Sequence, residues 1–170
     1  MKVKVKKLSK QACVPFKTHA NDFCYDVVAV SEQEVAPNVW KYGLGLAFQI
    51  ERGFQDLIFA TGLNRGKKTI HKTMADLTHS PLNLSIDLRP RSSVWKTGMV
   101  LSNCEGTIDE GYIGEVSAVF YHVMPDMPRY KVGDRIGQLK VGLTFPMEFE
   151  VVDELDDTTR GAGGYGSTGR

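Results

Sequence analysis

The feature that most constrains the fold is a repeated alternation of apolar and polar or small residues. In LGLAFQIE (44–51) every second residue is a large apolar one, and LSIDL (84–88) and MEFEVV (147–152) follow the same pattern. A period of two residues places alternate side chains on opposite faces of a β-strand. Each segment therefore predicts a half-buried strand. Helical periodicity is scarce.

Further segments extend this prediction to an all-β chain. EVSAVFYHV (115–123) is apolar on both faces, which predicts an interior strand, and the lysines of KVKVKK (2–7) suit an exposed edge. Turn signals separate the strands at residues 36–38, 89–90, 124–128 and 132–134. Many short strands with frequent turns are typical of a β-sandwich, jelly roll or barrel.

Composition limits the classes of partner. The chain has 170 residues and a net charge of +1, which fits one domain with no general attraction to nucleic acid or to an anionic membrane. The N-terminal MKVKVKKLSK has no apolar stretch behind it, and no apolar run approaches the ~20 residues that span a bilayer. Three cysteines without a C-x-x-C motif indicate reduced thiols. We therefore expect a cytoplasmic protein.

Two segments do not follow the strand pattern. Residues 52–83 contain the apolar LIFA, a basic run at 65–72 and TMADLT, which predicts a short helical turn. This segment is either a solvated surface excursion or a cover over an anionic ligand. The C-terminal RGAGGYGSTGR (160–170) contains G-x-G-x-x-G. A dinucleotide fold would also need a strand before that motif, a helix after it and an acidic residue further on.

Five stretches, in order, resemble the five motifs of the trimeric dUTPase family. They are YDVVA (25–29), RPRSS (89–93), GTIDEGYIGE (106–115), GDRIGQL (133–139) and RGAGGYGSTG (160–169). The resemblance implies an all-β, distorted jelly-roll or β-clip-like subunit in a homotrimer with active sites at the subunit interfaces. It also implies Mg²⁺-dependent hydrolysis of dUTP to dUMP and pyrophosphate by attack of water on the α-phosphate.

The resemblance also divides the chain. Residues 1–159 would form the β-domain, with an insertion at about 52–83, and residues 160–170 would form a flexible, glycine-rich C-terminal lid.

Asp109 is the residue to which the resemblance gives the chemistry. Taken alone, an aspartate shortly before Gly111 is more often an ordinary turn residue. Matched to the third motif, it becomes the expected general base that deprotonates the attacking water.

The resemblance assigns four residues to the base and sugar: Asn103, Gly106, Tyr112 and Tyr165. The Asn103 amide both donates and accepts, as the uracil edge requires. Gly106 belongs to the hairpin whose backbone reads the base. Tyr112 would pack on the deoxyribose and leave no room for a 2′-hydroxyl, and Tyr165 would stack on uracil.

The resemblance assigns the phosphates to a larger set of donors: Arg91, Ser92, Ser93, Gln138, Arg160, Gly164, Ser167 and Thr168. Arg91 is also expected to lock neighbouring chains together through its fork of donors. Ser93 stands where the family usually has glycine. Asp26 is expected to hold Mg²⁺ through water, although FCYDVVA departs from the usual Ala-Gly before this acid.

Two other functions remain open on the sequence. A dCTP deaminase shares the fold, but it needs a glutamate where this chain has Val119, and valine transfers no proton. A regulatory or binding protein built on the same fold would use residues 52–83 as its natural contact surface.

Overall fold

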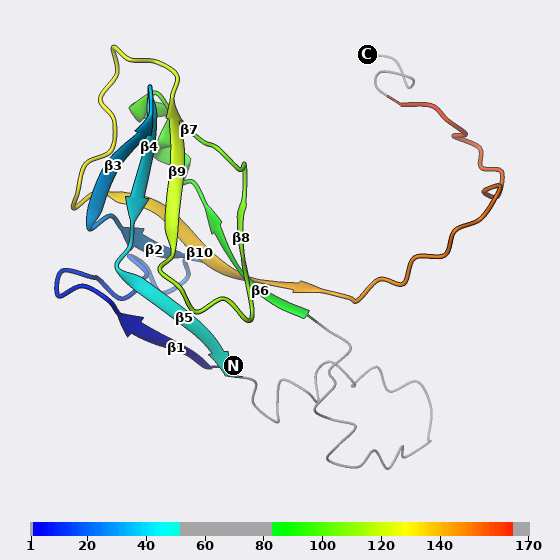
Figure 1. The fold of residues 1–170 in the computed structure, drawn as a ribbon, viewed down its shortest axis with the longest axis horizontal. Coiled ribbons are helices and arrows are strands. Elements are labelled where there is room, and N and C mark those ends of the chain that lie inside the picture. Colours follow the sequence, from blue (N-terminus) through cyan, green and yellow to red (C-terminus); the bar gives the residue numbers. More distant parts are fainter. Residues whose placement is uncertain (1, 52–82, 165–170) are drawn as a thin grey trace.

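The computed structural model describes residues 2–51 and 83–164. This part of the chain contains ten strands and one 3-10 helix, so the predicted all-β class is confirmed (Figure 1). The elements are β1 (Lys2–Lys7), β2 (Tyr25–Val28), β3 (Ser31–Ala36), β4 (Val39–Gly43), β5 (Leu46–Glu51), β6 (Asn83–Arg89), η1 (Ser92–Thr97), β7 (Met99–Leu101), β8 (Gly106–Asp109), β9 (Ser117–His122) and β10 (Arg135–Thr144).

The strands form three antiparallel sheets. Two sheets have four strands each, in the orders β2-β10-β6-β8 and β3-β4-β9-β7, and β1 pairs with β5 in the third. One continuous core joins them: Tyr42 and Phe120 come from the β3-β4-β9-β7 sheet, and Val27 and Ile136 come from the β2-β10-β6-β8 sheet. Burial of this core is the main force that holds the sheets together.

Most of the predicted strands are confirmed. Leu46, Phe48 and Ile50 of β5 are buried, and β1 pairs only with β5, as an edge strand does. Strand β9 lies between β4 and β7, which confirms its interior position. It buries only one of its two faces, however, because Tyr121 on the other face is 48% exposed.

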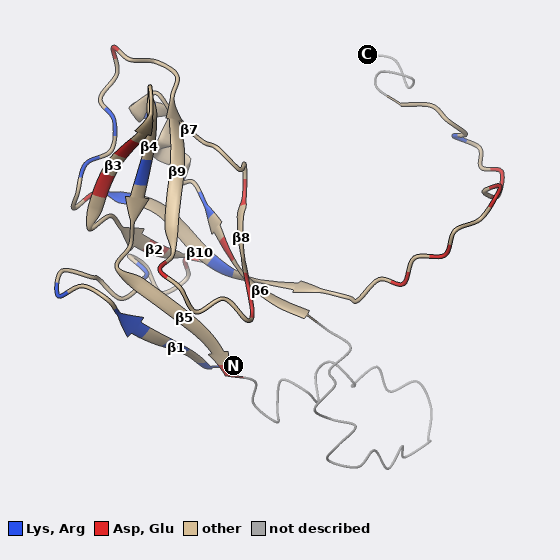
Figure 2. Cartoon of the chain, in the orientation of Figure 1, with Lys and Arg blue, Asp and Glu red and all other residues tan. Residues whose placement is uncertain are grey.

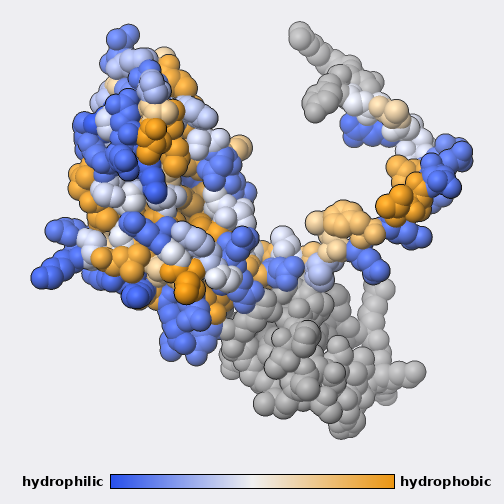
Figure 3. Space-filling model, in the orientation of Figure 1, coloured by the Kyte–Doolittle hydropathy of each residue, from blue (hydrophilic) through white to orange (hydrophobic). Residues whose placement is uncertain are grey.

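The strand predicted from MEFEVV is wrong. Residues 145–152 form no strand, and Met147, Phe149 and Val151 are 77–98% exposed. The chain leaves β10 after Thr144, and Pro146 follows, which supplies no N–H for a ladder. Residues 145–164, the C-terminal arm, extend away from the body (Figure 1), and Figure 3 shows apolar atoms along them.

The predicted insertion lies almost wholly outside the described residues. Residues 52–82, with the apolar LIFA, the basic run and the expected helical turn, are not described, and Asn83 already begins β6. In the described part of the chain, no helix has the length and apolar character to cross a membrane.

Candidate active site

Residues from the first, second and fourth predicted motifs meet at one end of the β2-β10-β6-β8 sheet. Gln138 of β10 pairs with Asp26 of β2 on one side and with Arg89 of β6 on the other. The side-chain amide of Gln138 donates to the carbonyl oxygen of Pro90 at 3.2 Å. The loop that follows β6 is therefore fastened to the central strand of the sheet.

Asp26 is the centre of a charge cluster at this end. Its carboxylate accepts hydrogen bonds from Arg91 Nε at 2.9 Å and from Arg135 at 3.0 Å, and its side chain is 13% exposed. The predicted locking role of Arg91 thus has a counterpart within one chain, where Arg91 ties η1 to β2. Sequence reasoning did not single out Arg135, although it lies in the GDR of the fourth motif.

The serines of the second motif lie beside this cluster. Ser92 begins η1 and is exposed, while Ser93 is half-buried, 3.5 Å from a terminal nitrogen of Arg91. Helix η1 ends at Thr97, and the next residue, Gly98, has a φ of 61° in the left-handed region. The Ser93 hydroxyl and the guanidinium groups of Arg91 and Arg135 therefore lie close together, and groups of this kind can donate hydrogen bonds to an anion.

A small pocket of about 200 Å³ lies between the turn after β7, strand β8 and strand β9. Its walls are Leu88, Ser102, Asn103, Gly106, Thr107, Ile108, Ser117 and Val119. A Cβ atom at Gly106 would stand 3.3 Å from Asn103 Nδ2, so a larger residue there would require the Asn103 amide to shift by a few tenths of an ångström. Asn103 and Gly106, both predicted to serve the base, are brought together here. Val119, which replaces the glutamate that a deaminase would need, lines the same pocket.

Asp109 and Tyr112 follow directly from this pocket. Asp109 is the last residue of β8 and is exposed, and its carbonyl oxygen accepts from the Tyr112 amide at 3.0 Å across the turn. The Tyr112 hydroxyl donates to the carbonyl oxygen of Glu115 at 3.0 Å. Tyr112 also packs on Gly114, where a Cβ atom would lie 2.5 Å from the hydroxyl. The tyrosine ring is thereby fixed across the turn.

The pairing register separates Asp109 from the charge cluster. Asp109 pairs with Ser85 of β6, whereas Gln138 pairs with Arg89, four residues further along the same strand. At about 3.3 Å per residue, that spacing is roughly 13 Å along the strand. One chain therefore does not bring the expected base and the expected phosphate donors together.

Of the predicted tail residues, the structure describes Arg160 and Gly164, which lie in the C-terminal arm. The Nε atom of Arg160 donates to the carbonyl oxygen of Gly163 at 2.9 Å, within the C-terminal arm, and a Cβ atom at Gly164 would meet nothing within 4 Å. Tyr165, Ser167 and Thr168 lie outside the described residues.

The charge cluster offers a hydrated magnesium ion one carboxylate, that of Asp26, beside the cationic groups of Arg91 and Arg135. Over residues 2–51 and 83–164, no group of three or more His, Cys, Asp and Glu side chains could hold a metal directly. Each oxygen of Asp26 accepts one arginine hydrogen bond and retains capacity for another. Mg²⁺ commonly keeps several waters and binds mainly through substrate phosphates, and a single carboxylate with free acceptor capacity suits that mode.

Comparison with known proteins identifies the family of the chain. The family model described as dUTPase matches residues 56–169. The deoxyuridine 5′-triphosphate nucleotidohydrolases of Gloeothece citriformis and Nautilia profundicola are 31% and 30% identical to the chain. The first alignment covers 99% of this chain and 97% of that protein, and the second covers 100% of both.

Solved structures share the fold. A mutant dUTPase of Staphylococcus bacteriophage 80alpha, solved with dUpNHpp, has a TM-score of 0.71 at 21% identity over 99% of each chain. A mutant dUTPase of phage phi11 of S. aureus, in which a structural Mg(II) ion is coordinated, has a TM-score of 0.62 at 18% identity over 92% of this chain and 100% of that one. By its motifs, its fold and its relatives, this chain belongs to the dUTPase family.

Proposed function

We propose that this enzyme hydrolyses dUTP to dUMP and pyrophosphate, with Asp109 as the general base. The observation that carries the proposal is the pocket formed by Asn103 and Gly106, with Asp109 at the far end of the same short strand. A pocket of about 200 Å³ suits a single pyrimidine ring, and its apolar wall at Val119 offers no acid to a deamination reaction.

In the proposed reaction the ionised Asp109 carboxylate takes a proton from a water molecule. The water oxygen forms a bond to the α-phosphorus, the bond from that phosphorus to the bridging oxygen breaks, and pyrophosphate leaves. Such a base typically contributes ~10²–10⁴-fold to the rate. Tyr112, which is fixed by its hydrogen bond to Glu115, would contact the sugar and exclude a 2′-hydroxyl.

The charge cluster would hold the triphosphate. Ser92, Ser93 and Gln138 supply neutral donors, and Arg91 adds positive charge while it remains paired with Asp26. When Mg²⁺ is bound, it neutralises phosphate charge, and Asp26 would hold it through its water shell. Arg160, Gly164, Ser167 and Thr168 would complete the phosphate site, and Tyr165 would cover the base.

A homotrimer with sites between subunits would reconcile these roles with the geometry. In one chain Asp109 lies about four residues along β6 from the charge cluster, so a complete site needs residues of two chains. The exposed apolar residues of the C-terminal arm also need another protein surface on which to pack. Residues 1–159 would then form the β-domain and 160–170 the lid over a neighbouring site.

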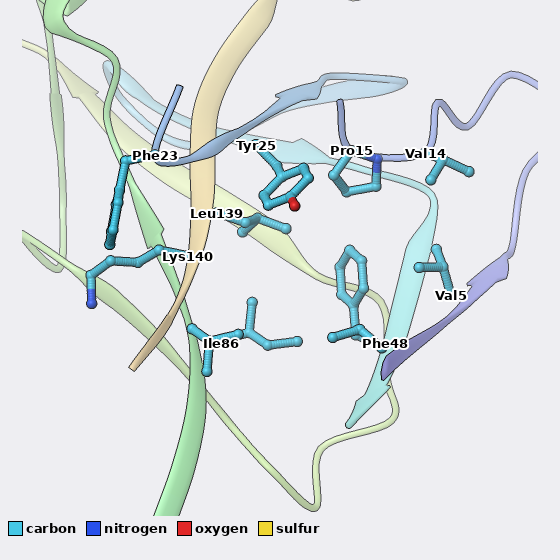
Figure 4. Close-up of a pocket in the computed structure, with 11 residues that line it drawn as sticks. Val5, Val14, Pro15, Phe23, Tyr25, Phe48, Ile86, Leu139 and Lys140 are labelled. Atoms are coloured by element: carbon cyan, nitrogen blue, oxygen red, sulfur yellow. The ribbon is translucent and has the colours of Figure 1, made fainter. Parts of the chain in front are cut away.

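The surface around β1 is a candidate for the surface on which the C-terminal arm of a second copy packs. An apolar cavity of about 480 Å³ opens beside it, and Figure 4 shows Val5, Phe48 and Ile86 pointing into it. The lysines of the β1 edge alternate with valines, and Glu148 and Glu150 of the arm alternate with apolar residues. If the C-terminal arm of a second copy paired with this edge, its glutamates could lie beside the lysines of β1 and its apolar residues beside the valines.

The decisive experiment measures pyrophosphate release from dUTP, UTP, dCTP and dTTP, with and without Mg²⁺. We expect a metal-dependent preference for dUTP, no ammonia release from dCTP, and an Asp109→Asn variant that binds dUTP but turns over at least ~10²-fold more slowly. Near-normal kcat in that variant would show that Asp109 is not the base. A cytoplasmic location is also proposed, supported by the three cysteines, which form no disulfide.

A further inference from the structure

The corner between β4 and β5 contains two glycines, in the sequence YGLGL (42–46). Strand β4 ends at Gly43 and β5 begins at Leu46. Gly45 lies between them with a φ of 62°, and a Cβ atom on it would lie 2.9 Å from Cγ2 of Val30. The corner therefore requires glycine. Gly45 is also buried, so its N–H group needs a partner outside the strand ladder.

The partner of this N–H group is the side chain of Glu115, at the end of the third motif. The Gly45 N–H donates to Oε1 of Glu115 at 2.8 Å. A Cβ atom at Gly43 would lie 2.6 Å from the same oxygen, so the missing side chain of Gly43 leaves the room that the carboxylate fills. Both glycines of the corner therefore serve one contact, because Gly45 supplies the donor and Gly43 supplies the space.

Backbone hydrogen bonds hold the next residue, Val116, against the same corner. The Leu44 N–H donates to the Val116 carbonyl oxygen at 3.0 Å, and the Val116 N–H donates to the Leu46 carbonyl oxygen at 2.9 Å. Figure 2, in which acidic residues are red, shows the segment between β8 and β9 passing beside the start of β5. The Val116 N–H and the Glu115 carbonyl belong to one planar peptide unit, so the bond to Leu46 also fixes the direction of that carbonyl.

The Glu115 carbonyl oxygen is the acceptor for Tyr112. The Tyr112 hydroxyl donates to it at 3.0 Å, and a Cβ atom at Gly114 would lie 2.5 Å from the hydroxyl oxygen. Tyr112 is 48% exposed, so packing covers only part of this side chain and the hydrogen bond to Glu115 matters for the place of its ring. Two contacts therefore connect the buried corner at Gly45, through Glu115, to the tyrosine ring.

We propose that Glu115 is a positioning residue, which fixes Tyr112 to the corner between β4 and β5 and thereby sets how strictly the enzyme rejects the 2′-hydroxyl of UTP. This inference rests on the proposed selection of dUTP by Tyr112. Exclusion by shape works only while the excluding group stays in place, because a single extra oxygen needs little additional room. Glu115 acts through Tyr112 and does not need to touch the substrate.

The test compares kcat/KM for dUTP with kcat/KM for UTP, because a loss of folded enzyme lowers both values together while a displaced ring changes their ratio. Glu115→Ala removes the acceptor of the Gly45 N–H and should lower the dUTP/UTP ratio about tenfold. Glu115→Gln keeps an acceptor oxygen, and its ratio should stay within about threefold of the parent value. Tyr112→Phe keeps the ring but loses the bond to Glu115, so it should also lower the ratio.

Two further variants separate positioning from charge and from independent effects. Asp126→Ala removes one negative charge from an exposed turn and should keep the parent ratio. The Glu115→Ala/Tyr112→Phe double variant should lower the ratio no further than the stronger single variant, because both changes break the same series of contacts. The melting temperature of each variant shows whether a change in the ratio accompanies a loss of stability.

An unchanged ratio in Glu115→Ala or in Tyr112→Phe would overturn the inference while leaving dUTP as the substrate. Losses that multiply in the double variant would also overturn it, because the two side chains would then act independently. If Glu115→Ala does not fold, Glu115→Asp takes its place, since its carboxylate is one methylene shorter and falls short of the Gly45 N–H. A parent enzyme that hydrolyses UTP as fast as dUTP would refute the proposed selection by Tyr112, and the inference with it.

Discussion

Asp26→Asn is the substitution that best tests the charge cluster, because it keeps the shape of the side chain and removes its charge. The Asp26 carboxylate accepts hydrogen bonds from Arg91 at 2.9 Å and from Arg135 at 3.0 Å. An asparagine has only one acceptor oxygen, and its amide group would face the second guanidinium as donor against donor. One arginine therefore loses its partner.

The expected loss of stability follows from the exposure of the two arginines. A hydrogen bond to a charged group contributes about 1.5–3 kcal/mol. Arg91 is 26% exposed, so its bond counts nearly in full, while Arg135 is 41% exposed and screened by water. We expect a loss of about 2–4 kcal/mol in the free energy of unfolding. For a chain of this size, that loss lowers the melting temperature by about 4–16 °C.

The assay is thermal unfolding at fixed protein concentration, since assembly would make the melting temperature depend on concentration. Asp126→Asn, on an exposed turn, is the matched control and should melt like the parent. A titration of Mg²⁺ in the activity assay tests the proposed role of Asp26 toward the metal. The Asp26→Asn variant should require more Mg²⁺ than the parent. A melting temperature within about 1 °C of the parent would refute the anchoring role, and an unchanged Mg²⁺ requirement would refute the role toward the metal.

Three further predictions concern the base pocket, the pH dependence of stability and the C-terminus. Gly106→Ala should push the Asn103 amide, which would lie 3.3 Å from the new Cβ, and should raise KM for dUTP more than it lowers the melting temperature. The hydrogen bond from Arg129 holds the pKa of Glu32 below its ordinary value, so Glu32 stabilises the fold above about pH 4.3 and this contribution is lost as the pH falls below it. Glu32→Gln should therefore be less stable than the parent in urea at pH 7, and the difference should shrink as the pH falls through the lowered pKa of Glu32. Removal of residues 160–170 should leave a folded protein with severely reduced turnover, and full activity after truncation would refute a role for this segment.

The sequence predicted most of the strands because a period of two residues shows which side chains share an apolar face. It does not show which other part of the protein packs against that face. Met147, Phe149 and Val151 alternate as clearly as the residues of β5, yet in one chain they are 77–98% exposed. Asp87 shows the converse error, since a polar residue in an alternating strand was expected to face water and is instead 6% exposed. Its partner, Lys140, comes from a strand more than fifty residues away in the sequence.

The motifs located most of the candidate site but not its geometry. Asp26, Arg91 and Gln138 meet because their strands are neighbours in one sheet. Ser102 and Ser117 of the base pocket were missed, because nothing near them in sequence signals that the turn after β7 faces β9. Arg135 was missed because GDR reads first as a turn, and only the fold brings this arginine to Asp26.

The distance between Asp109 and the charge cluster has a consequence for mixed populations of this protein. If each site takes its base from one chain and its phosphate donors from another, a chain lacking the base and a chain lacking the donors carry complementary defects. Asp109→Asn and Gln138→Ala chains, each inactive alone, would regain activity when unfolded and reassembled together. Random mixing would restore about a quarter of the sites. Two alleles with these complementary defects would then restore activity to each other when both are expressed in one cell. A site built within one chain would not allow this.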